Sequence, residues 1–332
     1  MQNKDSTIDT LVAATNKVAS LPARTHDGYL RLLAACKSLP PVRIAVVHPC
    51  STESLEAALE ARNHGLIEPV IVGPEARIRA LAQEQGLNLQ GIEIVATEHS
   101  HASAETAVAL ARTGKVAALM KGSLHTDELL HAVLMKEGGL RTARRLSHVF
   151  VMELPNYPRP LLITDAVVNI YPDLAAKCDI AQNAIDLAHR IGIAEPRVAI
   201  LSALETVNPA IVSTLHAAAL CKMAERGQIT GGKLDGPLAL DVALDPAAAR
   251  IKGIRSGVAG VADILVVPDL EAGNILVKQL TFLDDADSAG VVLGARVPIV
   301  LTSRADSVRN RLASVALGVL LTQKPATSGV AA

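Results

Sequence analysis

The stretch from residue 43 to residue 73, RIAVVHPCSTESLEAALEARNHGLIEPVIVG, contains two short apolar runs separated by a helical pattern. Both runs, 43–48 and 69–73, are rich in Val and Ile, as in strands that are buried on both faces. Between them Ser51 can cap a helix, and Gly65 stands where a helix commonly ends in a left-handed residue. The stretch therefore predicts a βαβ unit whose two strands are parallel.

The same alternation continues along the chain. Further apolar runs of strand length lie at residues 93–96, 116–120, 149–152, 161–164, 198–201, 263–267, 290–293 and 298–301. Because this many strands exceed the roughly 5–6 of an average sheet, we expect an α/β fold with two sheets, mainly parallel, in two domains. Three prolines between residues 155 and 160 place the domain boundary after the fifth strand.

Three further segments are expected to be helical, and the C-terminal tail is not. Residues 1–40 are expected to form one or two helices against the first domain. A helix that opens at Pro209 runs to Gly227, and another from about Asp306 carries one apolar stripe. The tail 324–332 is rich in Pro, Ser, Thr and Gly and is expected to fray.

The composition excludes several functions. Only 2% of the 332 residues are aromatic and the formal net charge is −1, so the chain has neither a base-stacking platform nor a basic surface for nucleic acid. No apolar run approaches the roughly 20 residues that span a bilayer, and the N-terminus lacks the apolar region of a leader. The four cysteines lack CxxC spacing, which favours reduced thiols. We expect a folded cytoplasmic protein with no nucleic-acid or membrane partner.

Polar residues gather where predicted strands end, and the richest group is LTSRADS at residues 301–307. A strand ends, Ser303 and Arg304 follow, and a helix begins, so that backbone N–H groups and the positive end of the helix face one point. Arg304 adds a planar charged fork that suits a phosphate or a carboxylate. The alternative is that Ser303 or Asp306 only caps the helix while Arg304 pairs with a surface acid. The residues alone leave both interpretations open.

Similar groups follow other predicted strands. Lys121-Gly122 joins a cation to a glycine that lets a ligand approach the backbone. Asp165 and Asn169 put a carboxylate and an amide after a later strand, although structural capping would explain them equally well. Because ligands of open α/β sheets bind outside the carboxyl ends of strands, the recurrence predicts a polar cleft that holds anions.

Two more polar segments belong to this set. The segment after the strand at 263–267 is too polar for a simple turn, with Asp269, Gly273, Asn274 and Lys278. Residues 231–241 form a glycine-rich segment that ends at Asp241 and is typical of a lid or a subunit contact.

Several common catalytic motifs are missing from the sequence. It has no GxxxxGK[ST] phosphate loop, no GxGxxG after the first strand and no nucleophile elbow. The pair His99 and His101 lies in a predicted surface connection, where a solvated pair is a better explanation than a metal site. His125, His131 and His148 can act as acids or bases, although a single His more often packs or forms a hydrogen bond.

Taken together in their order, these segments resemble the phosphate acetyl/butyryl transferase family. The resemblance runs from about residue 40 to 320. Its Lys-Glu-Gly-Gly-Leu-Arg and Ser-Arg-Ala-Asp motifs look closer to the butyryl branch than to the acetyl one. It rests on Lys121-Gly122, Lys136-Glu-Gly-Gly-Leu-Arg141, Leu146-Ser-His148, Ile163-Thr-Asp165, Leu201-Ser-Ala203, Asp235-Gly-Pro-Leu-Ala-Leu-Asp241, Pro268-Asp269, Ala272-Gly-Asn274 and Thr302-Ser-Arg-Ala-Asp306.

The resemblance implies reversible transfer of a short acyl group, acetyl or butyryl, between CoA and inorganic phosphate, without a metal or another cofactor. It implies two Rossmann-like domains with the site in the cleft between them, the first formed by residues 1–152 and 302–332 and the second by 153–301. It also implies a homodimer, or a larger homo-oligomer, joined through the second domain.

The resemblance also assigns roles to residues. Arg304 would hold phosphate, Ser303 would donate to the CoA sulfur or the oxyanion, and Asp306 would be the general base. The residues expected to bind substrate are Lys121, Gly122, Ser147, His148, Asp165, Asn169, Asp241, Asp269, Gly273, Asn274 and Lys278.

The chain departs from the acetyl branch at two points. That branch has its proposed base further along the helix, where this chain has Arg309-Asn310-Arg311, so Asp241 and Asp269 are alternatives to Asp306. The arginine that follows the Lys-Gly segment in that branch is replaced here by Leu130-His131.

Two other functions stay open at this point. One is a metal- and NAD(P)-dependent dehydrogenase of the isocitrate or isopropylmalate type, or one acting on a phosphate ester, since such enzymes use a related two-domain fold. The other is a CoA-binding sensor without catalysis.

Overall fold

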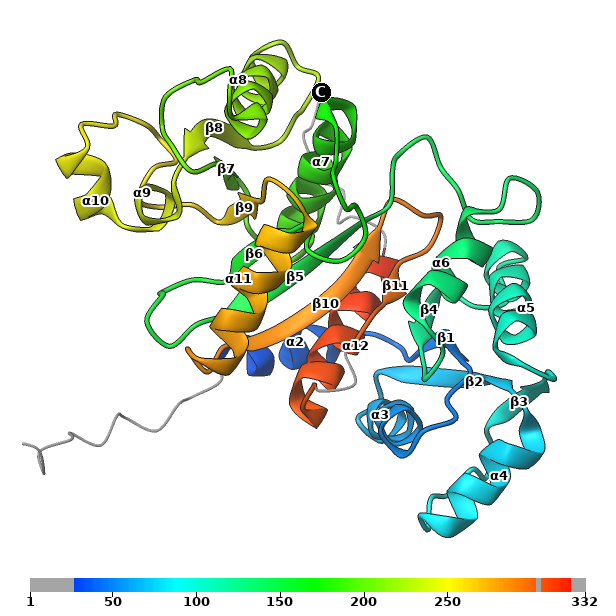
Figure 1. The fold of residues 1–332 in the computed structure, drawn as a ribbon. Helices are drawn as coiled ribbons and strands as arrows, with labels where there is room; N and C mark the ends of the chain where they lie inside the picture. The colour runs from blue at the N-terminus through cyan, green and yellow to red at the C-terminus, as the bar shows by residue number, and fades with distance from the viewer. Residues whose placement is uncertain (1–26, 303–305, 324–332) are drawn as a thin grey trace, which may run out of the picture.

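The computed structural model describes residues 27–302 and 306–323, which form one continuous sheet of eleven strands with helices on both faces (Figure 1). The strands are β1 Val42–Val47, β2 Ile67–Gly73, β3 Glu93–Ala96, β4 Ala118–Lys121, β5 Ser147–Glu153, β6 Leu161–Thr164, β7 Arg197–Leu201, β8 Lys233–Leu238, β9 Ile264–Val266, β10 Asp287–Leu293 and β11 Ile299–Val300. The helices are α2 Asp27–Cys36, α3 Thr52–Asn63, α4 Glu75–Glu84, α5 Ser100–Arg112, α6 Thr126–Leu134, α7 Leu174–Arg190, α8 Val212–Glu225, α9 Leu240–Leu244, α10 Pro246–Ile251, α11 Leu270–Phe282 and α12 Val308–Thr322.

The strand order is β3-β2-β1-β4-β11-β10-β5-β6-β9-β7-β8. Each flank is parallel, whereas the three central pairings, β11 with β10, β10 with β5 and β5 with β6, are antiparallel. The α/β class is therefore confirmed, but the expected two separate sheets are one. The long pairing of β10 with β5, from Asp287 opposite Glu153 to Leu293 opposite Ser147, joins the halves. The division into two domains stays a prediction.

Alternating residues of the strands fill a core on each face. On β1, Ala45 and Val47 pack towards α5 and α6, while Ile44 and Val46 pack towards α3 and α12. Both faces of the strand are buried because helices cover both sides, which explains the uninterrupted apolar run in the sequence. In the described residues no helix combines the length and apolar character needed to cross a bilayer.

Most predicted elements are present with small shifts at their ends. Ser51 caps α3 through a capping box, and Gly65 has a positive φ of 69°. The helix predicted from Pro209 begins later, at Val212. The last helix begins at Val308 with Ser307 as its cap, because the Ser307 side chain accepts a hydrogen bond from Asn310 N. The predictions for residues 1–26 and for the tail lie outside the described residues.

The glycine-rich segment 231–241 was expected to be a lid or a subunit contact, but it contains a strand. β8 pairs in parallel with β7 at the end of the sheet, with a break in register near Gly236-Pro237. Proline is tolerated there because an edge strand leaves some N–H groups without a ladder partner. A half-buried edge strand with glycine and proline lacks the apolar run by which the other strands are recognised.

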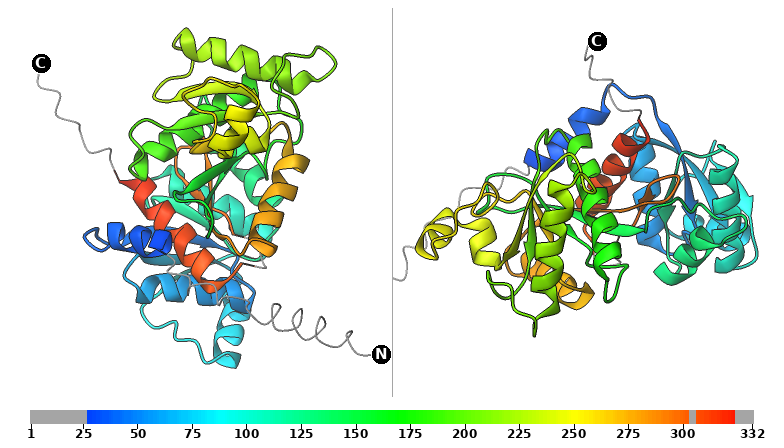
Figure 2. Two further views of the ribbon diagram at one scale, coloured as in Figure 1. Left: turned by 90° about the vertical axis from the view of Figure 1, so that its left-hand side faces the viewer. Right: turned by 90° about the horizontal axis from the view of Figure 1, so that it is seen from above.

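Helix α12 completes the edge of β10 that faces away from β5. β11 pairs with β10 only at Val291 and Val292, which leaves earlier amides of β10 without a strand partner on this side. Ser314 Oγ accepts a hydrogen bond from Gly290 N at 2.9 Å, and Asn310 Oδ1 accepts one from Ser288 N at 3.3 Å. Helix α2 lies against α12 (Figure 2). These contacts fix the start of α12, directly after residues 303–305, at the centre of the sheet.

Candidate active site

A cleft of about 420 Å³ opens where β4, β11 and the start of α12 meet α11. Five of the polar residues that line it belong to segments singled out in the sequence: Lys121, Asn274, Lys278, Thr302 and Asp306. Ser303 and Arg304 lie outside the described residues. Both Thr302 and Asp306, which flank the undescribed segment, line the cleft.

Lys121 is the last residue of β4 and is only 8% exposed. Its Nζ donates to the carbonyl of Gly122 at 3.3 Å. Gly122 permits this close approach of β4 to the end of β1, because a Cβ atom there would lie 2.4 Å from the Val47 carbonyl. Ser123 fastens the same turn by donating from Oγ to the His48 carbonyl at 2.8 Å. The lysine is thus held at a rigid strand end.

Helix α11 brings a second cation to the cleft. Asp269 caps the helix by accepting a hydrogen bond from Ala272 N at 2.9 Å. Gly273 packs against Ala166 and Val267, where a Cβ atom would come within 3.0 Å of a neighbour. Asn274 Nδ2 donates to the Ala166 carbonyl at 3.3 Å, and Lys278 follows one turn later on the cleft side.

The electrostatics of the cleft favour an anion. The N-terminus of α6 faces it through His125 and Thr126, and the first turn of α12 faces it through Asn310. Helix N-termini present unpaired N–H groups and a partial positive charge. Together with two lysines, they make a site in which one carboxylate, Asp306, stands among positive groups.

Asp165 and Asn169 do not line the cleft. They lie in the turn after β6, which uses their polar atoms internally. Asp165 Oδ1 accepts hydrogen bonds from Val167 N at 2.9 Å and Val168 N at 3.0 Å, and Oδ2 accepts one from Asn169 Nδ2 at 2.6 Å. Burial raises the pKa of Asp165, and these hydrogen bonds oppose the shift. The geometry matches the capping alternative, and a substrate role for the two residues stays a prediction.

Ser147 and His148 are fully buried in β5. Ser147 Oγ accepts a hydrogen bond from Asn183 Nδ2 of α7 at 2.9 Å. The His148 ring lies 4.3 Å from the ring of Phe150, which does line the cleft. Burial lowers the pKa of His148 to about 3, and the Leu301 carbonyl only partly opposes this. His148 is therefore neutral and stands behind the wall of the cleft.

The two alternative bases lie outside the cleft. Asp241, on α9, pairs with Lys252 at 3.1 Å and its side chain is 54% exposed. The hydrogen bond with Lys252 lowers the pKa of Asp241. Asp269 serves as the cap of α11. Of the three acids considered from the sequence, only Asp306 lines the cleft.

Sequence reasoning missed several residues that line the cleft. They are Thr126, Phe150, Ser288 and Asn310, while His125, which the sequence analysis names as a possible acid or base, also lines the cleft. Only Asn310 carried a usable signal, because it interrupts the otherwise apolar side of its helix. No group of three or more His, Cys, Asp or Glu side chains suited to a metal occurs among the described residues. His99 of the sequence pair caps α5, where Nδ1 accepts from Ala102 N at 3.1 Å.

A continuous α/β sheet with two lysines and two helix N-termini around a cleft is typical of enzymes that act on anionic substrates. The chain belongs to the phosphate acetyl/butyryl transferase family: the family described as "Phosphate acetyl/butaryl transferase" matches residues 101–319. It is accordingly an acyltransferase, as the sequence motifs predicted.

Individual relatives agree with this assignment. The chain is 62% identical to a phosphate acetyltransferase of Rhizobium meliloti over 92% of this chain and 96% of that one. It is 42% identical to a phosphate butyryltransferase of Clostridium acetobutylicum over 87% of this chain and 96% of that one. The higher identity is to the acetyltransferase, so the identities do not favour the butyryl branch that the motifs suggested.

A solved structure supports the fold. The crystal structure of a branched-chain phosphotransacylase from Enterococcus faecalis V583 superposes with a TM-score of 0.74 at 30% identity. The match covers 85% of this chain and 99% of that one.

His148 provides a test of the buried wall. Since its pKa falls from 6.5 to about 3 on folding, the unfolded chain binds a proton below pH 6.5 that the folded chain does not bind. The free energy of unfolding should therefore fall as the pH decreases from 6.5 towards 3. The free energy of unfolding, measured with urea, should therefore fall less between about pH 7 and about pH 5 in His148→Gln than in the parent. The exposed control His64→Gln should keep the parent's loss, and an equal loss in all three proteins would refute a buried neutral His148.

Proposed function

We propose that the cleft of Lys121, Lys278 and Asp306 is where this acyltransferase moves a short acyl group, acetyl or butyryl, between CoA and inorganic phosphate. The observation that carries the proposal is the position of residues 302 and 306, which line the cleft and flank Ser303 and Arg304. In the family resemblance this segment holds phosphate. The cleft supplies the positive surroundings that a phosphate dianion needs.

The reaction exchanges two nucleophiles on one carbonyl carbon. Phosphate oxygen attacks the thioester carbon, a tetrahedral oxyanion forms, and the CoA sulfur leaves with the bonding electrons. Donors already aimed at the oxyanion stabilise it, each by roughly 3–4 kcal/mol. We assign Arg304 to phosphate and Ser303 to the CoA sulfur or the oxyanion. Lys121 and Lys278 would offset the charge of phosphate and acyl phosphate.

The reverse direction needs a base. The thiol of CoA attacks as the thiolate, so a carboxylate that removes its proton accelerates the step. We assign this role to Asp306, since Asp241 and Asp269 do not line the cleft. CoA, phosphate and the acyl group account for every bond that forms or breaks. The reaction as we propose it uses no metal or other cofactor.

The function is tested by mixing the purified protein with CoA and acetyl, propionyl or butyryl phosphate. We expect thioester absorbance to rise with at least one of the three, and the initial rates then give the acyl preference. Absence of turnover with all three, together with tight CoA binding, would support the sensor instead. A nicotinamide-dependent absorbance change that requires a divalent metal would support the dehydrogenase.

Asp306→Asn separates the candidate bases. Removing a general base should lower kcat for thioester formation about 100-fold, with little change in the KM for acyl phosphate. The deficit should shrink at alkaline pH, because the CoA thiol then ionises without help. Asp241→Asn should keep the parent rate. A loss in Asp241→Asn equal to that in Asp306→Asn would remove Asp306 from this role.

We also propose that the chain works as a cytoplasmic homodimer. Exposed apolar side chains follow the carboxyl ends of β6, β7 and β8: Ile170 is 61% exposed, Tyr171 73%, Val207 54% and Ile251 85%. Such a surface is typical of a protein–protein interface. The four cysteines are all free, as a reducing compartment requires.

Light scattering tests the dimer. The parent should have about twice the mass of one chain, and Tyr171→Glu combined with Ile251→Glu should shift it towards the monomer because charges would be buried in the interface. Leu283→Glu, at a residue that is 79% exposed on the opposite flank of the second half, serves as the control. A monomeric parent would contradict the proposal.

A further inference from the structure

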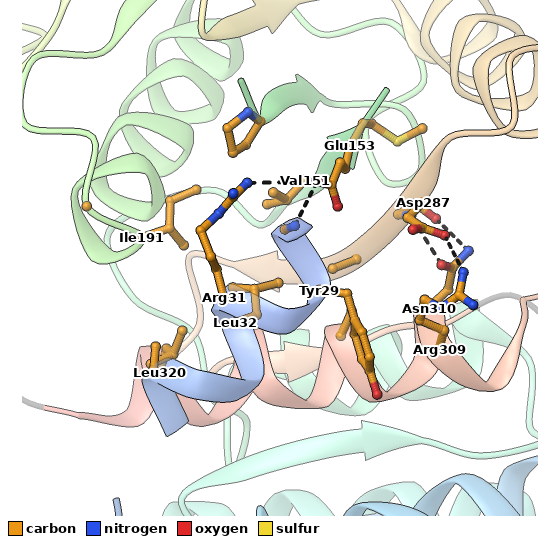
Figure 3. A pocket seen from close by; sticks show the side chains of 18 of the residues that line it. Tyr29, Arg31, Leu32, Val151, Glu153, Ile191, Asp287, Arg309, Asn310 and Leu320 are labelled. Atoms are coloured by element: carbon orange, nitrogen blue, oxygen red, sulfur yellow. Dashed lines mark hydrogen bonds and ion pairs between the residues drawn. The ribbon is translucent and has the colours of Figure 1, made fainter. Parts of the chain in front are cut away.

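A second cavity lies between α2, β10 and α12 (Figure 3). Its volume is about 300 Å³, and α2, β5, β10, α12 and the end of α7 surround it. The space exists because small side chains face it from three elements: Ala35 of α2, Ala289 of β10 and Ala313 of α12. The sequence motifs and the proposed reaction leave this cavity without a role.

The interior of the cavity is apolar. Leu32, Val151, Ile191 and Leu320 point into it, and Tyr29 lines one end (Figure 3). Ligand sites have volumes from about 300 Å³ upwards and mostly apolar walls with a few polar groups. Apolar walls of this kind favour an apolar ligand, because contact with it removes their surface from water. Its chemistry therefore fits an aliphatic chain.

Charged groups lie at its solvent side. Arg31 approaches Glu153 at 3.8 Å, and Arg309 approaches Asp287 at 3.5 Å. Arg190 also lines the cavity, and it donates to the Gln323 carbonyl at 2.7 Å. Among the residues that the structure describes, the lining thus contains three arginines and two carboxylates, one positive charge in excess. A single carboxylate on the ligand would balance it.

The cavity and the cleft share a wall. Ser288 and Asn310 line both, and they are hydrogen-bonded to each other, with Ser288 N donating to Asn310 Oδ1 at 3.3 Å. Asn310 lies in the first turn of α12, four residues after Asp306. A molecule packed against Ala313 and Asn310 from behind therefore contacts the helix that positions the cleft.

Helix α2 covers the cavity and is attached at both of its ends. Glu153 Oε1 accepts a hydrogen bond from Gly28 N at 2.7 Å, which anchors the first turn of α2. At the other end of α2, Cys36 Sγ donates to the Ala316 carbonyl of α12 at 3.5 Å. Helix α2 is thus attached both to β5 and to α12. A molecule that fills the cavity therefore acts on α12 by direct contact and through α2.

We propose that this cavity is a regulatory site for an aliphatic carboxylate of medium chain length. The chain occupies the apolar interior and the carboxylate lies near Arg31 and Arg190. Occupancy holds α12 in the position described here and so raises the affinity of the cleft for acyl phosphate. This second part rests on the proposed function, whereas binding to the cavity does not.

Two alanines of α2 give a matched pair of variants. Ala35 lines the cavity, and its neighbour Ala34 is exposed and does not. Ala35→Phe places a ring in the cavity or its mouth, while Ala34→Phe adds the same ring outside. Both residues are exposed on one helix, so neither substitution disturbs a packed core.

Calorimetry with sodium octanoate tests the binding. We expect octanoate to bind the parent and Ala34→Phe alike, and Ala35→Phe to bind it at least about tenfold more weakly. Arg31→Gln should weaken binding about threefold, since the ion pair at this exposed side chain is screened. Absence of binding to the parent, or equal binding to the parent and Ala35→Phe, would overturn the proposal.

Kinetics test the coupling. Saturating octanoate should lower the KM for acyl phosphate about twofold or more in the parent and Ala34→Phe, and leave it unchanged in Ala35→Phe. If octanoate instead occupied the acyl position of the cleft, it would raise the KM in all three proteins, and the regulatory role would fail. If no variant turned over any acyl phosphate, the proposed function would fail while calorimetry still decided the binding.

Discussion

The hydroxyl of Ser314 accepts a hydrogen bond from the amide of Gly290, in the half of β10 that no strand covers on that side. Asn310 does the same for Ser288 one turn earlier. An unpaired amide buried at this depth would cost roughly 1–3 kcal/mol, so two polar side chains of α12 take the place of a neighbouring strand. The helix cannot slide along β10 without breaking both bonds. This fixes the start of α12, and with it the segment 302–306 at the cleft.

The charge of the cleft follows from the same arrangement. Lys121 is nearly buried at a strand end that Gly122 and Ser123 fasten to β1, so its ammonium group cannot move away into solvent. Lys278 and the N-termini of α6 and α12 add further positive potential around the same space. An anion that enters removes this repulsion, and in a partly desolvated site each attraction is stronger than in water. In the proposed function, affinity for phosphate and acyl phosphate would therefore come from groups that are positioned before the substrate arrives.

The sequence predicted those features that depend on local patterns. The strands at 93–96 and 161–164 agree with β3 and β6 to the residue. β6 is buried along its whole length, and β3, at the edge of the sheet, is recognised by the short apolar run of Ile94, Val95 and Ala96. β8 was missed because an edge strand with Gly236 and Pro237 has no such pattern. Lys121 and Asp306 were predicted correctly to line the cleft because a polar residue that follows an apolar run can be recognised from the sequence alone. Phe150 and Ser288 were not, since only the antiparallel pairing of β5 with β10 brings them to the cleft.

The sequence predicts that the carboxyl ends of the strands meet in one crevice, but the strands of the two halves of the sheet run in opposite directions. Three successive antiparallel pairings separate β11 from β6, so β6 and β9 run opposite to β4 and β11. Their carboxyl ends, with Asp165 and Asp269, therefore point to the other edge of the sheet. Helix α11 connects that edge to the cleft. From its cap, Asp269, it runs back across the sheet. At 1.5 Å per residue, Lys278 lies roughly 13 Å further on. The second half thus reaches the cleft through the body of a helix, which explains why Lys278 and Asn274 line it while the strand-end acids do not.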